Sequence, residues 1–202
     1  MTLRPAPGTL LPDLPPRFAR GKLRDKALAL AFICLFLAGT LCCLPAGAAA
    51  ATSEYQVKAA FLYNFMKFID WPAEGLSSPA TLCLGILGKD PFGDALDEVR
   101  GKTAKGRRVV VVHFRSLEEV KDCDILFLSA SEKGRLPQIL KAVQHSRMLT
   151  VADQDGFCQA GGMINMVFVK KRVGFEVNLA AASRARLRVS SQLLKLARNV
   201  ME

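Results

Sequence analysis

The sequence predicts an α/β domain built on a mostly parallel β-sheet that helices cover on both faces. Short uncharged apolar runs of strand length recur along the chain, and short segments with helical periodicity separate them. Strands that are apolar along their whole length are typical of a parallel sheet buried on both sides. Two closely spaced strands near the C-terminus predict an antiparallel hairpin at one side of the sheet.

The elements follow one another in a regular order. Ser53 and Gln56 have the spacing of a capping box and precede an aromatic-rich helix that Trp71-Pro72 ends. The predicted strands are 81–88, 108–114, 124–129 and 148–153, and the helical segments between them are 90–99, 117–120 and 133–143. The hairpin comprises 163–170 and 172–178, and helical pieces follow it, with N-caps at Asn178 and at Ser190 or Ser191.

The N-terminal 50 residues have the layout of a cleavable signal peptide with a basic n-region. Residues 1–26 are basic and rich in proline, 27–44 are uncharged and apolar, and 46–50 are small. We expect cleavage after Ala50 or Ala51, which leaves 51–202 as a single domain. The alternative is an uncleaved membrane anchor, since the 18 apolar residues lie at the lower edge of a bilayer span. The adjoining small residues favour cleavage.

The predicted export changes what the net charge of the chain indicates about its partners. Residues 1–50 carry six of the 28 basic and two of the 18 acidic residues, so the mature domain has a net charge of +6. An exported protein of this modest charge rarely meets nucleic acid, which excludes that partner class.

Export also removes three of the six cysteines and leaves Cys83, Cys123 and Cys158. An odd number in an oxidising compartment indicates one disulfide and one spare thiol. Cys83 and Cys123 would lie at the N-terminal ends of strands that are often neighbours, so a disulfide is feasible, and two buried thiols are the alternative. Cys158 is either a redox-responsive or intermolecular thiol or, as we favour, a small buried side chain.

Polar residues follow the strands at the edge where ligands of α/β sheets collect. Asp90, His113, Ser131 and Asp153 are the candidates for a crevice that holds a small polar solute. Ordinary turn and capping roles are the competing interpretation. Other residues at the same edge are Lys89, Arg115, Ser129, Glu132 and Asp155.

The sequence carries no recognisable catalytic or metal-binding motif. His113 and His145 are its two histidines, and neither lies in a zinc-binding pattern. A serine nucleophile elbow and the Walker and Rossmann fingerprints are absent. We therefore predict no cofactor, no metal and no enzymatic activity.

Eight segments in order make the mature chain closely similar to the YfiR family of periplasmic proteins: VKAAFLYNFMKFIDWP, LCLGILGKDPFGDAL, CDILFLSASE, ILKAV, LTVADQDGF, GGMINM, VGFEVNL and LRVSSQLLKLARNV. The resemblance implies a three-layer αβα sandwich that is often a homodimer and has no catalytic activity. It also implies repression of a membrane-bound diguanylate cyclase through the cyclase's periplasmic sensor domain. Disulfides sense a redox signal in that scheme, and biofilm growth follows when repression ends.

The resemblance extends to particular residues. Cys83 and Cys123 match a disulfide pair of the family. Cys158 resembles one half of a second pair whose partner would fall near Asn165, so that bridge is in doubt here. Arg186 stands where the family commonly has glycine, which puts the helix break at that position in question.

These features lead to two function hypotheses. The first is a periplasmic regulator that inhibits the sensor domain of an inner-membrane signalling enzyme, a diguanylate cyclase by resemblance. The second is a periplasmic module that binds a small solute at the Asp90, His113, Ser131 and Asp153 crevice and serves another signalling or uptake system.

Overall fold

The computed structural model describes residues 46–72, 78–121 and 123–202. The chain divides into Met1–Ala46 and Gly47–Glu202, and the second unit contains every β-strand of the described residues. The predicted signal peptide lies outside the described residues, except for the backbone of its last few positions.

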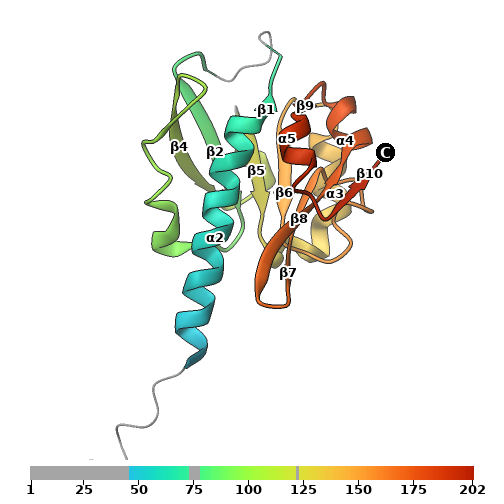
Figure 1. The fold of residues 1–202 in the computed structure, drawn as a ribbon. Helices are drawn as coiled ribbons and strands as arrows, with labels where there is room; N and C mark the ends of the chain where they lie inside the picture. Colours follow the sequence, from blue (N-terminus) through green and yellow to red (C-terminus); the bar gives the residue numbers. More distant parts are fainter. Residues whose placement is uncertain (1–45, 73–77, 122) are drawn as a thin grey trace, which may run out of the picture. The chain divides into compact units, whose positions relative to one another are not determined.

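An eight-stranded sheet forms the centre of the domain, in the order β10-β8-β7-β6-β5-β2-β4-β3 (Figure 1). The five strands from β4 to β7 run parallel to one another, while β8 is antiparallel to β7 and β3 is antiparallel to β4. The strands are β2 Thr81–Leu87, β3 Thr103–Ala104, β4 Arg107–Phe114, β5 Ile125–Leu128, β6 Leu149–Ala152, β7 Ile164–Val169, β8 Arg172–Asn178 and β10 Asn199–Met201.

Helices lie on both faces of this sheet. They are α2 Ala46–Phe68, α3 Leu136–Val143, α4 Leu179–Arg184 and α5 Ser191–Leu194, with 3-10 turns η2 Gly93–Leu96, η3 Leu117–Glu119 and η4 Ala130–Arg135. A separate two-stranded sheet pairs β1 Ile69–Asp70 with β9 Arg188–Val189, and so fixes the end of α2 to the C-terminal region.

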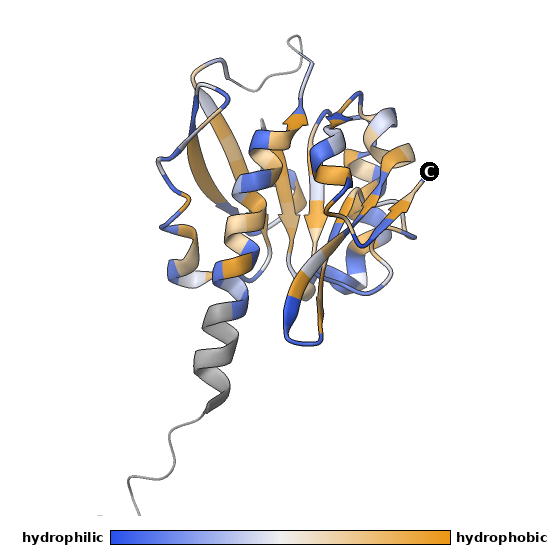
Figure 2. Ribbon diagram, in the orientation of Figure 1, coloured by the Kyte–Doolittle hydropathy of each residue, from blue (hydrophilic) through white to orange (hydrophobic). Residues whose placement is uncertain are grey.

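Alternating residues of the strands feed two hydrophobic cores. Leu84 and Ile86 point into the core that contains Phe65 of α2, together with residues of η2, α4 and α5. Leu126 and Leu128 point into the opposite core, which α3 covers. Figure 2 shows hydrophobic residues concentrated along the strands. The predicted three-layer α/β arrangement with a mostly parallel sheet is confirmed.

The predicted strands and the C-terminal hairpin are confirmed, and two helix predictions need correction. Segment 90–99 forms only the 3-10 turn η2, because Gly93 takes a left-handed φ of 51° and interrupts the helical path. Helix α2 begins at Ala46, so Ser53 does not begin it. Asn178 and Ser190 do cap helices: their side chains accept hydrogen bonds from the amides of Ala181 and Leu193.

The helix break near Arg186 persists although the glycine is missing. Arg186 has φ 60°, the left-handed conformation that glycine usually supplies after a helix. The amide of Leu187 donates to the carbonyl oxygen of Ala182 over 3.0 Å, which closes the end of α4. The arginine therefore occupies a glycine conformation and keeps the turn.

Candidate functional site

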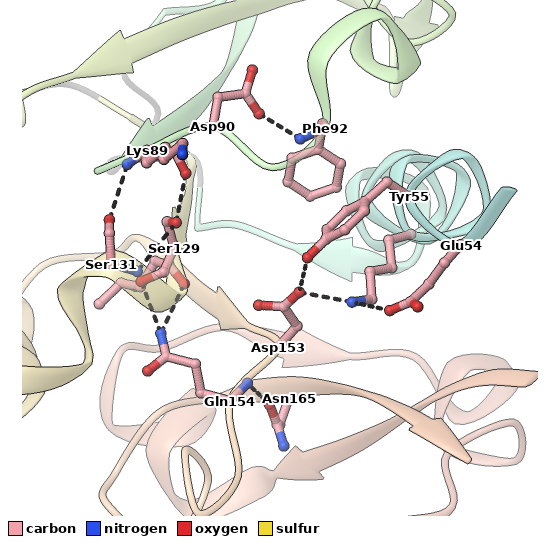
Figure 3. Close-up of polar contacts among 12 residues, drawn as sticks. Glu54, Tyr55, Lys89, Asp90, Phe92, Ser129, Ser131, Asp153, Gln154 and Asn165 are labelled. Atoms are coloured by element: carbon pink, nitrogen blue, oxygen red, sulfur yellow. Dashed lines mark hydrogen bonds and ion pairs between the residues drawn. The ribbon is translucent and has the colours of Figure 1, made fainter. Parts of the chain in front are cut away.

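The polar residues predicted for a crevice lie where the parallel strands end, and they fall into separate groups of contacts. Figure 3 shows the contacts of three of them, Asp90, Ser131 and Asp153. Asp90 and His113 form one pair. Ser131 belongs to a loop contact with Lys89, and Asp153 faces helix α2. The strand ends therefore gather polar side chains as expected, but these side chains are already engaged by other groups of the protein.

Asp90, which pairs with His113, lines an open groove. The Nε2 of His113 is 2.9 Å from one carboxylate oxygen of Asp90, and the other oxygen accepts a hydrogen bond from the amide of Phe92 over 2.8 Å. A groove of about 580 Å³ adjoins Asp90 and Phe92, and Tyr55 lines it from helix α2. Further acidic side chains at its wall are Asp94 and Glu98.

Ser131 holds two strand ends together. Its hydroxyl oxygen accepts a hydrogen bond from the amide of Lys89 over 3.0 Å, while the hydroxyl of Ser129 donates to the Lys89 carbonyl over 2.6 Å. Gly88 permits this close approach: a Cβ there would lie 2.4 Å from the Ser131 hydroxyl, and its φ of 90° also favours glycine. Ser131 thus fixes the loop after β2.

Asp153 lies in a buried charged cluster that the sequence did not reveal. The amine of Lys58 lies 2.7 Å from its carboxylate, and the hydroxyl of Tyr55 donates to it over 3.1 Å. Glu54 binds the same amine at 2.6 Å. The side chains of Lys58 and Asp153 are only 5% and 6% exposed. The cluster fixes helix α2 against the end of β6.

The cluster changes the acidity of its members. Burial alone would lower the pKa of the Lys58 amine, but hydrogen bonds to Asp153 and Glu54 outweigh burial and raise it. Burial, and then the Asp153 carboxylate, raises the pKa of the Tyr55 hydroxyl. The spacing of Glu54 and Lys58, four residues apart on one helix, was the one sequence feature that could have indicated this cluster.

Cys83 and Cys123 lie side by side at the N-terminal ends of β2 and β5. Their sulfur atoms are 2.8 Å apart, and both side chains are buried. The next residue, Asp124, accepts a hydrogen bond from the Cys83 amide over 2.8 Å and forms a buried ion pair with Arg107. Neighbouring strands therefore bring the two sulfurs together, as the sequence predicted.

Cys158 is buried beside the C-terminal hairpin. Its side chain is enclosed, with 1% of the residue exposed, and its sulfur lies 3.8 Å from the Met163 carbonyl oxygen. Burial, and then the Glu176 carboxylate, raises the pKa of the thiol to about 12. The position near which a second cysteine would fall carries Asn165, whose side-chain oxygen accepts from the Gln154 amide. These contacts agree with a small buried side chain.

The described part of the chain offers neither a metal-binding cluster nor a membrane span. Within residues 46–72, 78–121 and 123–202, no three or more His, Cys, Asp or Glu side chains come together in a way that could hold a metal ion. None of the helices in these ranges is long and apolar enough to cross a membrane.

Two solved structures resemble this chain at low sequence identity. A conserved domain protein from Vibrio cholerae biovar El Tor shares the fold, with a TM-score of 0.50 and 9% identity, over 70% of this chain and 59% of that one. An ABC domain in complex with L-Trp from Streptococcus pneumonia matches with a TM-score of 0.49 and 11% identity, over 73% and 60%. The chain spans about three fifths of the length of each.

The sequence itself matches a family model over nearly all of residues 51–202. The match runs from residue 55 in helix α2 to residue 198 just before β10, so it includes the five parallel strands β4, β2, β5, β6 and β7 and the β7–β8 hairpin. Both sulfurs of the Cys83 and Cys123 pair and most of the cluster around Asp153 lie within it. The chain belongs to the YfiR/HmsC-like family.

Proposed function

We propose that this protein is a periplasmic repressor that binds the periplasmic sensor domain of an inner-membrane diguanylate cyclase and lowers cyclic di-GMP. The observation that carries the proposal is the family match over residues 55–198. At the level of the family, that match supports a periplasmic regulator of cyclic di-GMP signalling. The apolar segment at 27–44 supports export to the periplasm.

The proposal includes no catalytic step for this chain. Ser131 and Asp153, two of the predicted polar residues at the strand ends, are engaged by the Lys89 amide and the Lys58 amine. A regulator of this kind acts by binding, and it can shift the enzyme's equilibrium only by its preference for one state. A homodimer is part of the proposal, by analogy with the family.

The Cys83 and Cys123 sulfurs form the redox element of the proposal. Their separation of 2.8 Å, within a chain destined for an oxidising compartment, supports a disulfide between them. Closure of a loop of about 40 residues stabilises a domain by up to about 4 kcal/mol. A reduced pair would therefore loosen the domain and weaken repression.

A binding titration tests the proposal. Protein purified from the periplasm is titrated, by calorimetry, with the periplasmic domains of inner-membrane sensor proteins encoded beside it. We expect one of these domains to bind with a dissociation constant in the micromolar range or lower. We also expect this protein to inhibit the full-length cyclase that contains that domain. Absence of binding to every such domain contradicts the proposal.

The groove beside Asp90 favours a second candidate, a small-solute sensor. Its acidic wall and the ring of Tyr55 are suited to a cationic solute. A thermal-shift screen with polyamines and cationic amino acids tests it, because a ligand that binds only the native state raises the melting temperature. An Asp94→Asn, Glu98→Gln variant should lose any such shift. No shift with any cation contradicts this candidate.

A further inference from the structure

An apolar groove separates helix α2 from the β7–β8 hairpin; we name it the hairpin groove. Its volume is about 690 Å³, and its apolar lining is Val57 and Phe61 of the helix with Phe168 and Val173 of the hairpin. Val57 is 42% and Phe168 49% exposed. Contiguous exposed apolar side chains with a polar rim are a feature of protein interaction sites and grooves.

The hairpin that forms one wall projects beyond the sheet. In the described part of the chain, β6 pairs with β7 only at Ile164 and Asn165, and β10 pairs with β8 only from Glu176 onward. The outer half of the hairpin is therefore a two-stranded ribbon. A ribbon of this kind is marginally stable by itself, so contact with another molecule would stabilise it.

The rim of the hairpin groove is basic. Lys171 and Arg172 line it, and Lys170 precedes them at the tip, where Figure 2 shows hydrophilic residues. All three are exposed. The one acidic residue of the lining, Glu54, is held by the amine of Lys58 at 2.6 Å. Within residues 46–72, 78–121 and 123–202, no ion pair engages Lys170, Lys171 or Arg172. The described surface therefore offers apolar contact beside exposed positive charge.

The turn keeps its lysines at a cost in stability. Lys170 and Lys171 have φ values of 52° and 61°, the left-handed conformation that two-residue hairpin turns usually assign to asparagine and glycine. This conformation is unfavourable for side chains that carry a Cβ. Strain of this kind collects at functional sites, which is consistent with a role for the two charges in binding.

We propose that the hairpin groove binds a segment of the partner's periplasmic domain that carries acidic side chains beside apolar ones. This inference rests on the proposed function and adds the surface and the chemistry of the contact. The basic rim of the groove is complementary in charge to the acidic side chains of such a segment, and the apolar lining suits its apolar side chains. A second copy is a poor occupant, because a twofold interface would bring the two basic rims together. A concave floor also suits an inserted segment better than a flat lipid surface.

Site-specific photocrosslinking tests the inference in cells that express the full chain from its own locus. The photoreactive amino acid p-benzoylphenylalanine replaces Phe168, and in a matched control it replaces Val112, an apolar residue of β4 that is 38% exposed. Each strain is also made with Lys171→Glu and Arg172→Glu. A charge-matched control carries Lys133→Glu and Lys141→Glu, two exposed lysines of η4 and α3. Mass spectrometry identifies the peptide joined to the probe.

We expect the Phe168 probe to join an acidic, apolar periplasmic segment of one inner-membrane protein. Reversal of Lys171 and Arg172 should lower the yield by about tenfold, because attraction between the rim and acidic side chains becomes repulsion, and the control pair should leave it unchanged. Adducts with phospholipid, adducts with a second copy, no adduct at all, or a yield insensitive to the reversal would each overturn the inference.

The same strains separate this inference from the proposed function. Cyclic di-GMP is measured in each, together with a deletion of the whole chain. If deletion raises cyclic di-GMP and the Phe168 probe captures no acidic segment, the hairpin groove is not the binding site for the partner. The proposed repressor role is then retained. If deletion leaves cyclic di-GMP unchanged, the repressor role fails regardless of the crosslinks. Thermal melting of each purified variant confirms that these exposed substitutions leave the fold intact.

Discussion

The ion pair between Lys58 and Asp153 shows how one buried contact can connect a helix to a sheet. The two groups lie 2.7 Å apart and are almost fully enclosed. Sequence alone placed Asp153 at a strand end, where it resembled a ligand-binding carboxylate. Its partner comes from 95 residues earlier in the chain. A contact over such a separation leaves no local pattern.

Substitution of Lys58 by methionine should destabilise the protein by about 3 kcal/mol, because Asp153 would remain buried without a counter-charge. Urea unfolding measures the change. Lys67→Met, at an exposed position of the same helix, should change stability by less than about 0.5 kcal/mol. Adding Asp153→Leu to Lys58→Met should recover much of the loss, and a double variant as unstable as the single one would contradict this role for the pair.

Cys158 should be nearly inert in the native protein. Its pKa of about 12 lies above the ordinary 9.0, so folding favours the protonated thiol. This contribution to stability is complete below pH 9 and is lost as the pH rises toward 12, because the unfolded state releases its proton first. Compared with Cys158→Ala, the wild-type protein should lose more stability between about pH 9 and pH 11. Parallel pH profiles for the two proteins would show this to be wrong.

Arg186→Gly should stabilise the protein by about 1 kcal/mol. The arginine has a left-handed φ of 60°, which glycine adopts without strain. Thermal unfolding measures the gain, and Arg184→Gly, within α4, should instead cost about 1 kcal/mol. A loss of stability on Arg186→Gly would mean that the arginine side chain makes a contact worth more than the strain.

Among the elements, β2 and β5 carry the clearest prediction about covalent structure. Protein purified from the periplasm without reductant should contain a Cys83 to Cys123 disulfide, seen as a mass about 2 Da below that of the reduced chain. The double variant Cys83→Ala, Cys123→Ala should be less stable than the oxidised wild-type protein by up to about 4 kcal/mol. It should differ much less from the reduced wild-type protein. Free thiols at both positions in protein from the periplasm would contradict the prediction.

The sequence predicted some elements much better than others. Segments such as 108–114 are β-branched and continuous, so their strands could be located without tertiary information. The short strands β1, β9 and β10 have two or three residues each and exist only through their partners. Segment 90–99 has a helical beginning, but Gly93 and the Asp90 side chain redirect the backbone into a single turn. Only the resemblance pointed to Arg186 as unusual.

For the whole molecule, the two-sided apolar pattern of the strands determined the three-layer fold, whereas the candidate site depended on pairing that the pattern could not show. Asp90 and His113 do come together, 2.9 Å apart, since β2 and β4 are neighbours. Ser131 and Asp153 bind Lys89 and Lys58 instead. The hairpin groove could not be predicted from the sequence either, because Phe168 has the appearance of an ordinary core residue within an alternating strand.

If this protein acts from the periplasm to repress a diguanylate cyclase, the cellular concentration of cyclic di-GMP must depend on its presence and on its export. Mass spectrometry compares the wild-type strain, a deletion strain, and deletion strains that express either the full chain or residues 51–202 without the apolar leader. We predict that deletion raises cyclic di-GMP severalfold, that the full chain restores the low level, and that the leaderless chain does not. An unchanged concentration in the deletion strain, or equal rescue by the leaderless chain, would contradict repression from the periplasm.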